Sequence, residues 1–262
     1  MLNRRFILGV APAMALTALI PDDAFAGGSL ASWDNLLAKY VRPGGDGLNR
    51  VDYAAWKDNS ADMSALNAVV NAFAAMSVST LPKAEQFCVW ANLYNALTLQ
   101  VVLGRFPVRS IRDIKSSPLA MGPWKDKRIT VQGKRLSLDD IEHNILRKQW
   151  REPRVHYAVN CASIGCPNLL RRGWRAETLE AELTSAARAF INSPRGVRVV
   201  RAGQVRVSSI YQWFKVDFGN SDAGVLAHLR QYAAPALAAQ LVNARIVGHD
   251  YDWSINAISG GR

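Results

Sequence analysis

A long apolar segment near the middle of the chain constrains the fold most strongly. Residues 82–106 read PKAEQFCVWANLYNALTLQVVLGRF, a run that opens with Pro82 and ends close to Gly104 and Pro107. Proline is favourable in the first turn of a helix, and glycine and proline mark helix ends, so the segment predicts one long helix. Because this helix would be apolar almost all round, we expect it to be central and buried.

Two amide side chains interrupt this apolar surface. Asn92 and Asn95 are three residues apart and therefore share one face of the predicted helix. A buried amide without hydrogen-bond partners would cost about 1–3 kcal/mol, so both side chains must be satisfied. Two interpretations stay open at this point. The amides either bond to neighbouring backbone and fix a loop, or they belong to a functional site.

The rest of the chain mixes helical and strand patterns without a βαβ rhythm, a repeat or a linker. We expect helices over residues 29–41, 61–78, 176–192, 221–232 and 234–243, hairpins over 128–136 and 197–208, and strands over 154–160 and 245–248. Ser137 and Asp140 have the spacing of a capping box, which predicts a helix after them. The sequence thus predicts a single α+β domain, in which the central buried helix packs on short antiparallel strands and hairpins.

The first residues resemble an export signal. Arg4 and Arg5 precede an apolar stretch that runs from Phe6 to Ile20, and small residues in Ala24-Phe25-Ala26 fit a signal-peptidase site. The stretch is shorter than the roughly 20 apolar residues that span a bilayer. We therefore expect residues 1–26 to be a twin-arginine export signal and residues 27–262 to be a soluble domain that is released into the periplasm.

The charge of the chain restricts its partners. Its formal net charge is +11 and its pI is about 9.9. Such a charge favours an anionic membrane surface, or an anionic or peptide-like substrate. No nucleic-acid recognition motif accompanies the charge, so nucleic-acid binding is not expected. The sequence indicates no cofactor and leaves the substrate and the oligomeric state open.

The stretch HYAVNCASIGCP, residues 156–167, holds most of the reactive side chains. Cys161 and Cys166 could bind zinc together with His143 or His156, could form a disulfide, could supply a nucleophile, or could simply pack in the core. Cys88, in the middle of the apolar helix, is expected to be a packing residue. Three cysteines cannot all pair, so at least one thiol is free or intermolecular.

The nucleophile interpretation makes geometric demands. Cys161 would lie at the end of the predicted strand 154–160, and the small residues after it would expose backbone N–H groups to an oxyanion. A regular strand would place His156 about 16 Å away, across the pleat. We therefore expect His143 to be the base, about 4–5 Å from the sulfur. Glu142 would point about 100° away from His143 and is expected to pair with an arginine, Arg147 or Arg154.

Five blocks of the chain carry a resemblance to a known family. VWANLYNALTLQVVL, SLDDIEHNILR, RVHYAVNCASIGCPNL, WFKVDF and YDWSIN occur in this order. Over about residues 80 to 256 the chain resembles the DUF547 family, a family of unknown function that is similar to papain-like cysteine enzymes. The resemblance implies a papain-like fold and the signature positions Asn92, Asn95, Glu142, His143, Cys161 and Trp253. Plant members carry serine where this chain has Cys166, which favours Cys161 as the essential sulfur.

The leading hypothesis is a hydrolase or acyltransferase that acts on an amide or ester bond through Cys161. His143 would be the base, and Asn92 or Asn95 would orient it or donate to the oxyanion. Two alternatives remain. The chain could be a non-catalytic envelope binding module that uses the same groove, or it could hold a metal ion on its cysteines and histidines.

Overall fold

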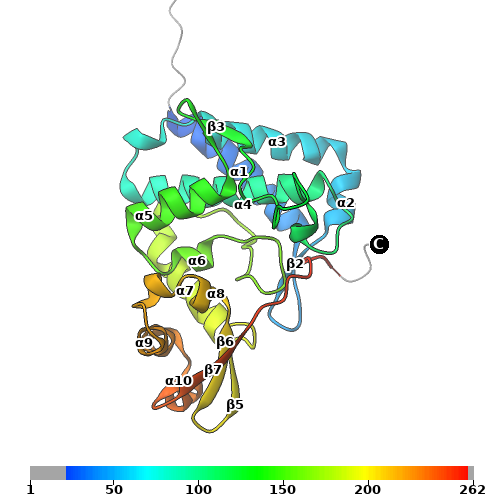
Figure 1. Cartoon of the computed structure of the whole chain (residues 1–262). Helices are drawn as coiled ribbons and strands as arrows, with labels where there is room; N and C mark the ends of the chain where they lie inside the picture. The colour runs from blue at the N-terminus through cyan, green and yellow to red at the C-terminus, as the bar shows by residue number, and fades with distance from the viewer. Residues whose placement is uncertain (1–21, 259–262) are drawn as a thin grey trace, which may run out of the picture.

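The helix α4, Lys83–Leu103, lies at the centre of the larger of two hydrophobic clusters in the computed structural model, which describes residues 22–258. Every residue from 87 to 99 is buried. The helix α3, Ser60–Ala75, packs against α4, and α1, Asp22–Tyr40, packs against α3 (Figure 1). The prediction of a central buried helix is confirmed, because a helix without a polar face is stable only when neighbours cover it on all sides.

Short elements surround these three helices. They are α2 Tyr53–Asp58, η1 Val78–Thr80, η2 Ile111–Asp113, the hairpin of β1 Val41–Pro43 with β2 Asn49–Val51, and the hairpin of β3 Ile129–Val131 with β4 Lys134–Leu136. Gln132 and Gly133 join β3 to β4 with positive φ angles of 46° and 77°. This two-residue turn fits the twist of a hairpin, so the first predicted hairpin is confirmed.

The second cluster is built on a three-stranded sheet. Its strands are β5 Val197–Arg201, β6 Gln204–Ser208 and β7 Arg245–Asp250, and its helical elements are α8 Ile210–Trp213, η5 Lys215–Phe218, α9 Asp222–Tyr232 and α10 Pro235–Leu241. The helix α7, Leu179–Ile191, contributes to both clusters, and η4, Ala176–Thr178, lies against the first. β5 pairs with β6 as the second predicted hairpin, whereas β7 pairs with β6 in parallel. The sheet is therefore mixed and not purely antiparallel, which leaves the α+β class of the prediction intact.

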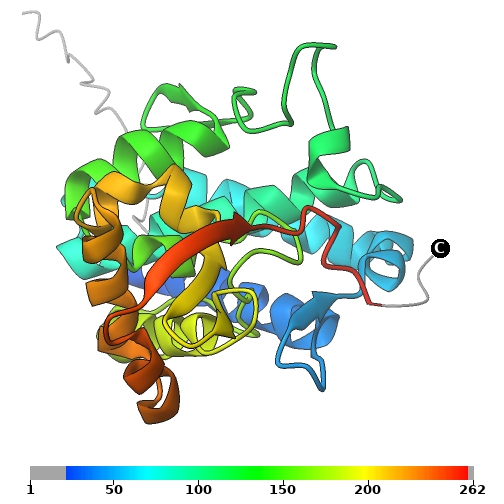
Figure 2. The same cartoon turned by 60° about the horizontal axis from the view of Figure 1, so that its bottom comes forward.

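The C-terminal segment joins the two clusters. After β7 the chain runs along the molecule towards β2 (Figures 1 and 2), where Ala257 forms a parallel bridge with Val51. On the way, Ser163 and Ile255 form an antiparallel bridge. The residues that follow β7 are consequently held against the loop that carries the cysteines.

The predicted strand over residues 154–160 is wrong. This segment forms the short helix α6, Val155–Ala158, in which the His156 and Tyr157 amides donate to the Pro153 and Arg154 carbonyls. Residues 155–160 are buried throughout, polar as well as apolar. The alternation of apolar residues therefore did not mark a buried and an exposed face, and periodicity over so short a run cannot separate a strand from a buried helix.

The helix after residue 137 begins as predicted but is wound differently. Ser137 and Asp140 form the capping box, with the Ser137 amide donating to Asp140 Oδ2 at 2.8 Å and the Asp140 amide donating to Ser137 Oγ at 3.2 Å. The first part, η3, Asp140–Leu146, is a π-helix, and α5, Arg147–Trp150, continues it as an α-helix. Such π-helical turns are rare in proteins, and many of those that occur lie at functional sites.

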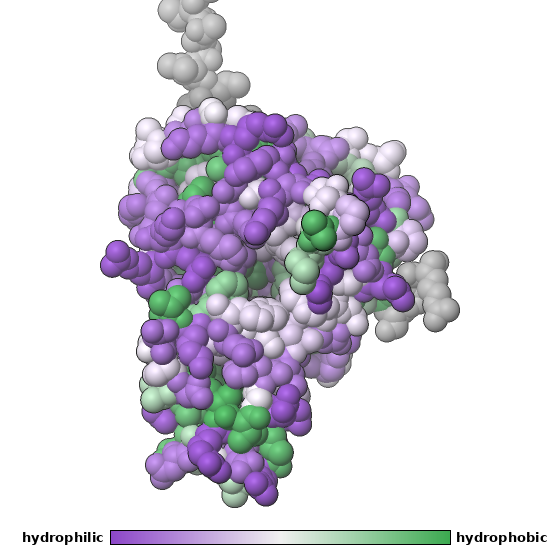
Figure 3. Space-filling model, viewed as in Figure 1, coloured by the Kyte–Doolittle hydropathy of each residue, from purple (hydrophilic) through white to green (hydrophobic). Residues whose placement is uncertain are grey.

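Most of the predicted export signal, residues 1–21, lies outside the described residues. α1 already begins at Asp22, seven positions before the expected helix start at Ser29. Between residues 22 and 258, no helix combines the length and the apolar character that a membrane span requires. The face of the molecule seen in Figure 3 is mostly hydrophilic, and a hollow with paler residues at its edge separates its upper and lower parts.

Candidate functional site

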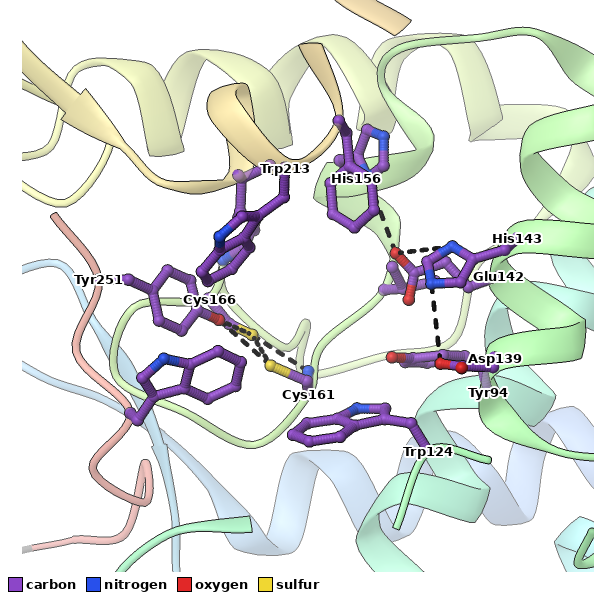
Figure 4. A pocket seen from close by; sticks show the side chains of 15 residues that line it. Tyr94, Trp124, Asp139, Glu142, His143, His156, Cys161, Cys166, Trp213 and Tyr251 are labelled. Carbon is purple, nitrogen blue, oxygen red and sulfur yellow. Dashed lines mark hydrogen bonds and ion pairs between the residues drawn. The ribbon is translucent and has the colours of Figure 1, made fainter. Parts of the chain in front are cut away.

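A pocket of about 160 Å³ lies where the two clusters meet. Its walls come from distant parts of the chain and include Tyr94 from α4, Glu142 and His143 from η3, His156 from α6, Trp213 from α8, Tyr251 after β7, and Cys161 and Cys166 from the loop after α6 (Figure 4). The sulfur atoms and Tyr251 lie on one side, and His143, Glu142 and Asp139 on the other. The predicted residues Cys161, His143 and Glu142 are thus brought to one cavity.

The Cys161 thiol is free and half-buried, and three polar side-chain groups surround its sulfur. Its sulfur is 2.7 Å from the Cys166 sulfur, 3.2 Å from Ser163 Oγ and 3.2 Å from the Tyr251 hydroxyl. No histidine is among the hydrogen-bond partners that residues 22–258 provide for this sulfur. No hydrogen bond therefore joins His143 to this thiol, and both histidines lie across the pocket from it (Figure 4).

Cys166 is the better stabilised of the two sulfurs as a thiolate. Burial alone would raise its pKa, but hydrogen bonds from Cys161, Ser163 and Tyr251 outweigh burial and lower the pKa to about 6. The backbone N–H of Cys161 also donates to this sulfur at 3.1 Å. In contrast, the hydrogen bond with Cys166 and burial raise the pKa of Cys161. Of the two sulfurs, Cys161 therefore keeps its proton more readily than Cys166 does.

The backbone N–H groups of the cysteine loop are largely engaged. Ala162 donates to Asn160 Oδ1 at 2.8 Å, Ile164 to the Ser254 carbonyl at 2.8 Å and Gly165 to the Asp252 carbonyl at 2.8 Å. The amides expected to face an oxyanion are thus used to fix the loop. The Tyr251 hydroxyl is the side-chain group that reaches the Cys161 sulfur from outside this loop.

Glu142 lies between the two histidines. Its Oε1 is 3.9 Å from His143 Nδ1 and 3.8 Å from His156 Nδ1. The prediction that Glu142 turns away from His143 is wrong, because a π-helix has more residues per turn than an α-helix and brings neighbouring side chains closer in angle. The arginines expected as its partners are paired elsewhere, Arg147 with Asp217 and Arg154 with Glu152 and Glu180.

His156 lines the pocket as well, although a regular strand would have placed it far from Cys161. Residues 155–158 form α6 and not a strand, so that distance argument does not apply. Its Nε2 is 2.7 Å from Asp217 Oδ2, and its ring stacks on Phe214 with centroids 4.3 Å apart. Although burial would raise the pKa of Asp217, its hydrogen bonds with His156 and Arg147 hold that pKa well below the usual range.

The two amides of α4 have different partners. Asn95 Oδ1 accepts from the Asn160 amide at 2.8 Å, and its Nδ2 donates to the Ala158 carbonyl at 2.9 Å. Asn92 bonds in the same two-sided way to the backbone of Trp174, at 2.9 and 3.0 Å. Neither amide lines the Cys161 pocket in the described part of the chain. Asn95 positions the residues that lead into Cys161, and Asn92 fixes a more distant loop.

Aromatic residues form a wall that sequence reasoning found only in part. Trp253, a signature position of the resemblance, stacks on Trp213 at 5.5 Å and meets Trp124 edge-on at 5.7 Å between centroids. Tyr251, which touches both sulfurs, was missed as a site residue although it stands in the same block, YDWSIN. Asp217 likewise stands in the block WFKVDF. Membership in these family blocks is the sequence feature that could have identified Tyr251 and Asp217 as site residues.

Two predictions about binding can be compared with this pocket. Within residues 22–258, no group of three His, Cys, Asp or Glu side chains is placed to hold a metal ion. No lysine or arginine lines the pocket in the described chain, although the net charge of the whole chain is +11. The pocket instead carries Asp139, whose pKa is raised by burial. An anionic substrate stays a prediction from net charge alone.

Comparison with known proteins supports the resemblance seen in the sequence. No curated protein and no solved structure matches this chain. Residues 78–191 match the family model described as "Protein of unknown function, DUF547". The matched segment runs from η1 to α7 and contains α4, Glu142, His143, His156 and both pocket cysteines. This segment of the chain is therefore similar to the DUF547 domain family, the family that the sequence blocks resemble.

Proposed function

We propose that this protein is a cysteine-dependent hydrolase or acyltransferase that acts on an amide or ester bond, with Cys161 as the nucleophile. The observation that carries the proposal is that the half-buried Cys161 thiol opens on the same pocket as His143, His156 and Glu142. A nucleophile and titratable groups that face one cavity are the parts that acyl transfer requires.

Each group has a role in this proposal. As the Cys161 sulfur attacks the carbonyl carbon, its proton passes to the Cys166 sulfur at 2.7 Å. The negative charge that develops on the carbonyl oxygen is stabilised by the Tyr251 hydroxyl, which lies 3.2 Å from the attacking sulfur. His143, whose side chain is one-third exposed, donates a proton to the leaving amine or alcohol and then activates water or an acceptor.

The proposal includes a location. We infer export through the twin-arginine route and action in the periplasm, from Arg4, Arg5 and the apolar stretch after them. The basic surface would favour contact with anionic membrane. A thiol in that compartment meets oxidising conditions, so its redox state matters for its chemistry.

A second candidate function is a non-catalytic envelope binding module. The wall of Trp124, Trp213 and Trp253 favours it, because closely placed aromatic rings supply a large contact surface for a planar or apolar ligand group. Trp213 remains 46% exposed, which leaves ring surface for such a ligand. In this case Cys161 would line the pocket without reacting.

Acyl-enzyme capture tests the proposal. The reduced protein is mixed with an activated acetyl ester and its intact mass is followed over time. We expect one acetyl group to appear on Cys161 and then to be released, in the original chain and in the Cys88→Ala control. Cys161→Ala should not be acylated, and His143→Gln should be acylated but should release the acetyl group more slowly.

The reactivity of the Cys161 thiol is a second test of its role as the nucleophile. If iodoacetamide labels Cys161 no faster than a free reference thiol at about pH 6.5, the thiol is not activated and the nucleophile role fails. A Cys161→Ala protein that keeps the thermal shift of the original chain with an aromatic ligand would then support the binding module.

A further inference from the structure

The loop of residues 161–166 holds two free thiols in contact. The Cys161 and Cys166 sulfurs are 2.7 Å apart, both are unbonded, and both touch the Tyr251 hydroxyl, at 3.2 and 3.1 Å (Figure 4). The third cysteine, Cys88, is buried in α4 and is not part of this cluster. Two thiols that close to each other can form a disulfide without a large movement of the backbone.

The backbone of the loop is fixed independently of the sulfurs. Ala162 adopts a left-handed conformation with φ 61°, and a Cβ on Gly165 would lie 2.9 Å from the Tyr251 ring and from the Asp252 nitrogen. Arg195 donates to the carbonyls of Ile164 and Cys166 from the other side. The proximity of the thiols is therefore built into the fold, and closing a disulfide here requires little additional ordering.

The two sulfurs differ in access and in hydrogen bonding. Cys161 is half-buried at the pocket wall, whereas Cys166 is 3% exposed. Cys166 accepts hydrogen bonds from the Cys161 amide at 3.1 Å, from Tyr251 at 3.1 Å and from Ser163 at 3.5 Å. An incoming thiolate can thus reach the Cys161 sulfur. When a disulfide between the two cysteines is cleaved, the electron pair would go to Cys166, because that sulfur accepts the hydrogen bonds. A stabilised thiolate is the faster leaving group in thiol–disulfide exchange.

We propose that Cys161 and Cys166 are a reversible dithiol–disulfide couple, in which Cys161 exchanges with a small external thiol or disulfide and Cys166 is the resolving sulfur. In oxidation, Cys161 passes its proton to the Cys166 thiolate while its sulfur attacks a small disulfide, and one external thiolate is released. Cys166 then attacks the Cys161 sulfur of the mixed disulfide, and the proton of Cys166 passes to the second external thiolate as it leaves. In reduction, an external thiolate attacks Cys161, the internal S–S bond breaks, and Cys166 receives the electron pair. A second external thiolate then attacks the external sulfur of this mixed disulfide, which releases Cys161 and a small disulfide.

The couple does not depend on the proposed acyl transfer, although it affects it. A disulfide occupies the Cys161 sulfur, so the oxidised protein has no nucleophile and the reduced protein has one. The redox test therefore uses thiol counting and mass, with no ester or amide substrate. Its failure leaves the acyl-transfer proposal standing, and failure of acyl transfer leaves the couple standing.

The experiment uses the Cys88→Ala chain equilibrated with mixtures of reduced and oxidised glutathione as the probe. We expect the two remaining thiols to be lost together, with a mass change of two hydrogens and no bound glutathione. Cys166→Ser in this background should accumulate glutathione on Cys161, because nothing resolves the mixed disulfide. Cys161→Ser should stay unmodified, because Cys166 is buried.

Tyr251→Phe keeps the ring and removes the hydroxyl donor. Loss of one hydrogen bond to the leaving thiolate should slow reduction by dithiothreitol about fivefold. If the Tyr251 hydroxyl does not stabilise the leaving thiolate, the rate of reduction stays unchanged in this variant. That result would show that the hydroxyl has no role in the couple. The couple itself is overturned if both thiols persist in excess oxidised glutathione, or if glutathione is found on Cys166 and not on Cys161.

Discussion

Asn95 holds the backbone of Asn160, 65 residues further along the chain, one position before the Cys161 thiol. The Asn95 carbonyl oxygen accepts from the Asn160 amide at 2.8 Å, while its amide nitrogen donates to the Ala158 carbonyl at 2.9 Å. The Asn160 side chain then accepts from the Ala162 amide at 2.8 Å. The buried central helix thereby fixes the backbone on both sides of Cys161.

Asn95→Ala should lower the free energy of unfolding by about 1–3 kcal/mol, because it leaves the buried Asn160 N–H without a partner. The Ala158 carbonyl keeps the hydrogen bond that Trp174 Nε1 donates to it at 3.1 Å. It should also change the rate at which iodoacetamide labels Cys161. Asn92→Ala is the matched control, since that amide makes an equivalent pair of bonds to Trp174. We expect a similar loss of stability by denaturant titration but an unchanged labelling rate. Equal effects of both variants on the thiol would contradict the positioning role of Asn95.

Gly165→Ala should disturb the sulfur cluster. The added Cβ would lie 2.9 Å from the Tyr251 ring and the Asp252 nitrogen, so the loop and the C-terminal segment must separate. We expect a loss of about 1–3 kcal/mol, as in overpacked sites, together with slower formation of the disulfide between Cys161 and Cys166. Gly45→Ala is the control, because nothing lies within 4 Å of the added methyl group. A Gly165→Ala protein as stable as this control would show that the contact with Tyr251 is not tight.

His228 should make stability depend on pH. Its Nε2 is 2.8 Å from the Tyr157 hydroxyl, and burial lowers its pKa to about 4 from the usual 6.5. Below pH 6.5 the unfolded chain binds a proton that the folded chain does not, so stability falls as pH decreases from 6.5 to 4. The loss attributable to this group reaches at most about 3 kcal/mol.

Urea unfolding of the original chain and of His228→Gln across this pH range measures the effect. The difference between the two stability curves should be constant above pH 7 and should shrink or reverse towards pH 4, because glutamine does not titrate. Two curves that stay parallel down to pH 4 would mean that His228 takes up its proton in the folded protein with an ordinary pKa.

Replacement of both Arg4 and Arg5 by lysine should retain the protein in the cytoplasm, because the twin-arginine pair is the feature that the export pathway reads. Cell fractionation and immunoblotting measure the outcome. Arg201→Lys, at an exposed position of β5, is the control and should be delivered normally. Periplasmic delivery of the double variant would show that another route is used.

Local sequence determined those elements whose signals lie within a few residues of one another. The uninterrupted apolar character of residues 82–106 predicted the buried helix α4, the turn at Gln132 and Gly133 predicted a hairpin, and Ser137 with Asp140 predicted a helix start. Each rests on backbone conformation or on contacts between near neighbours, so the sequence alone contains the physical cause. The family blocks also marked Cys161, His143 and Glu142 as signature positions, and the fold places all three at one pocket.

Tertiary packing decided the rest. Residues 154–160 alternate like a strand but form α6, because the segment is buried on all sides and its environment outweighs a preference spread over a few residues. The π-helical turn that aims Glu142 between two histidines has no local signature. Tyr251 reaches Cys161 across 90 residues and Asp217 reaches His156 across 61. Contacts over such separations depend on how whole elements pack, and one sequence read along its length does not contain that information.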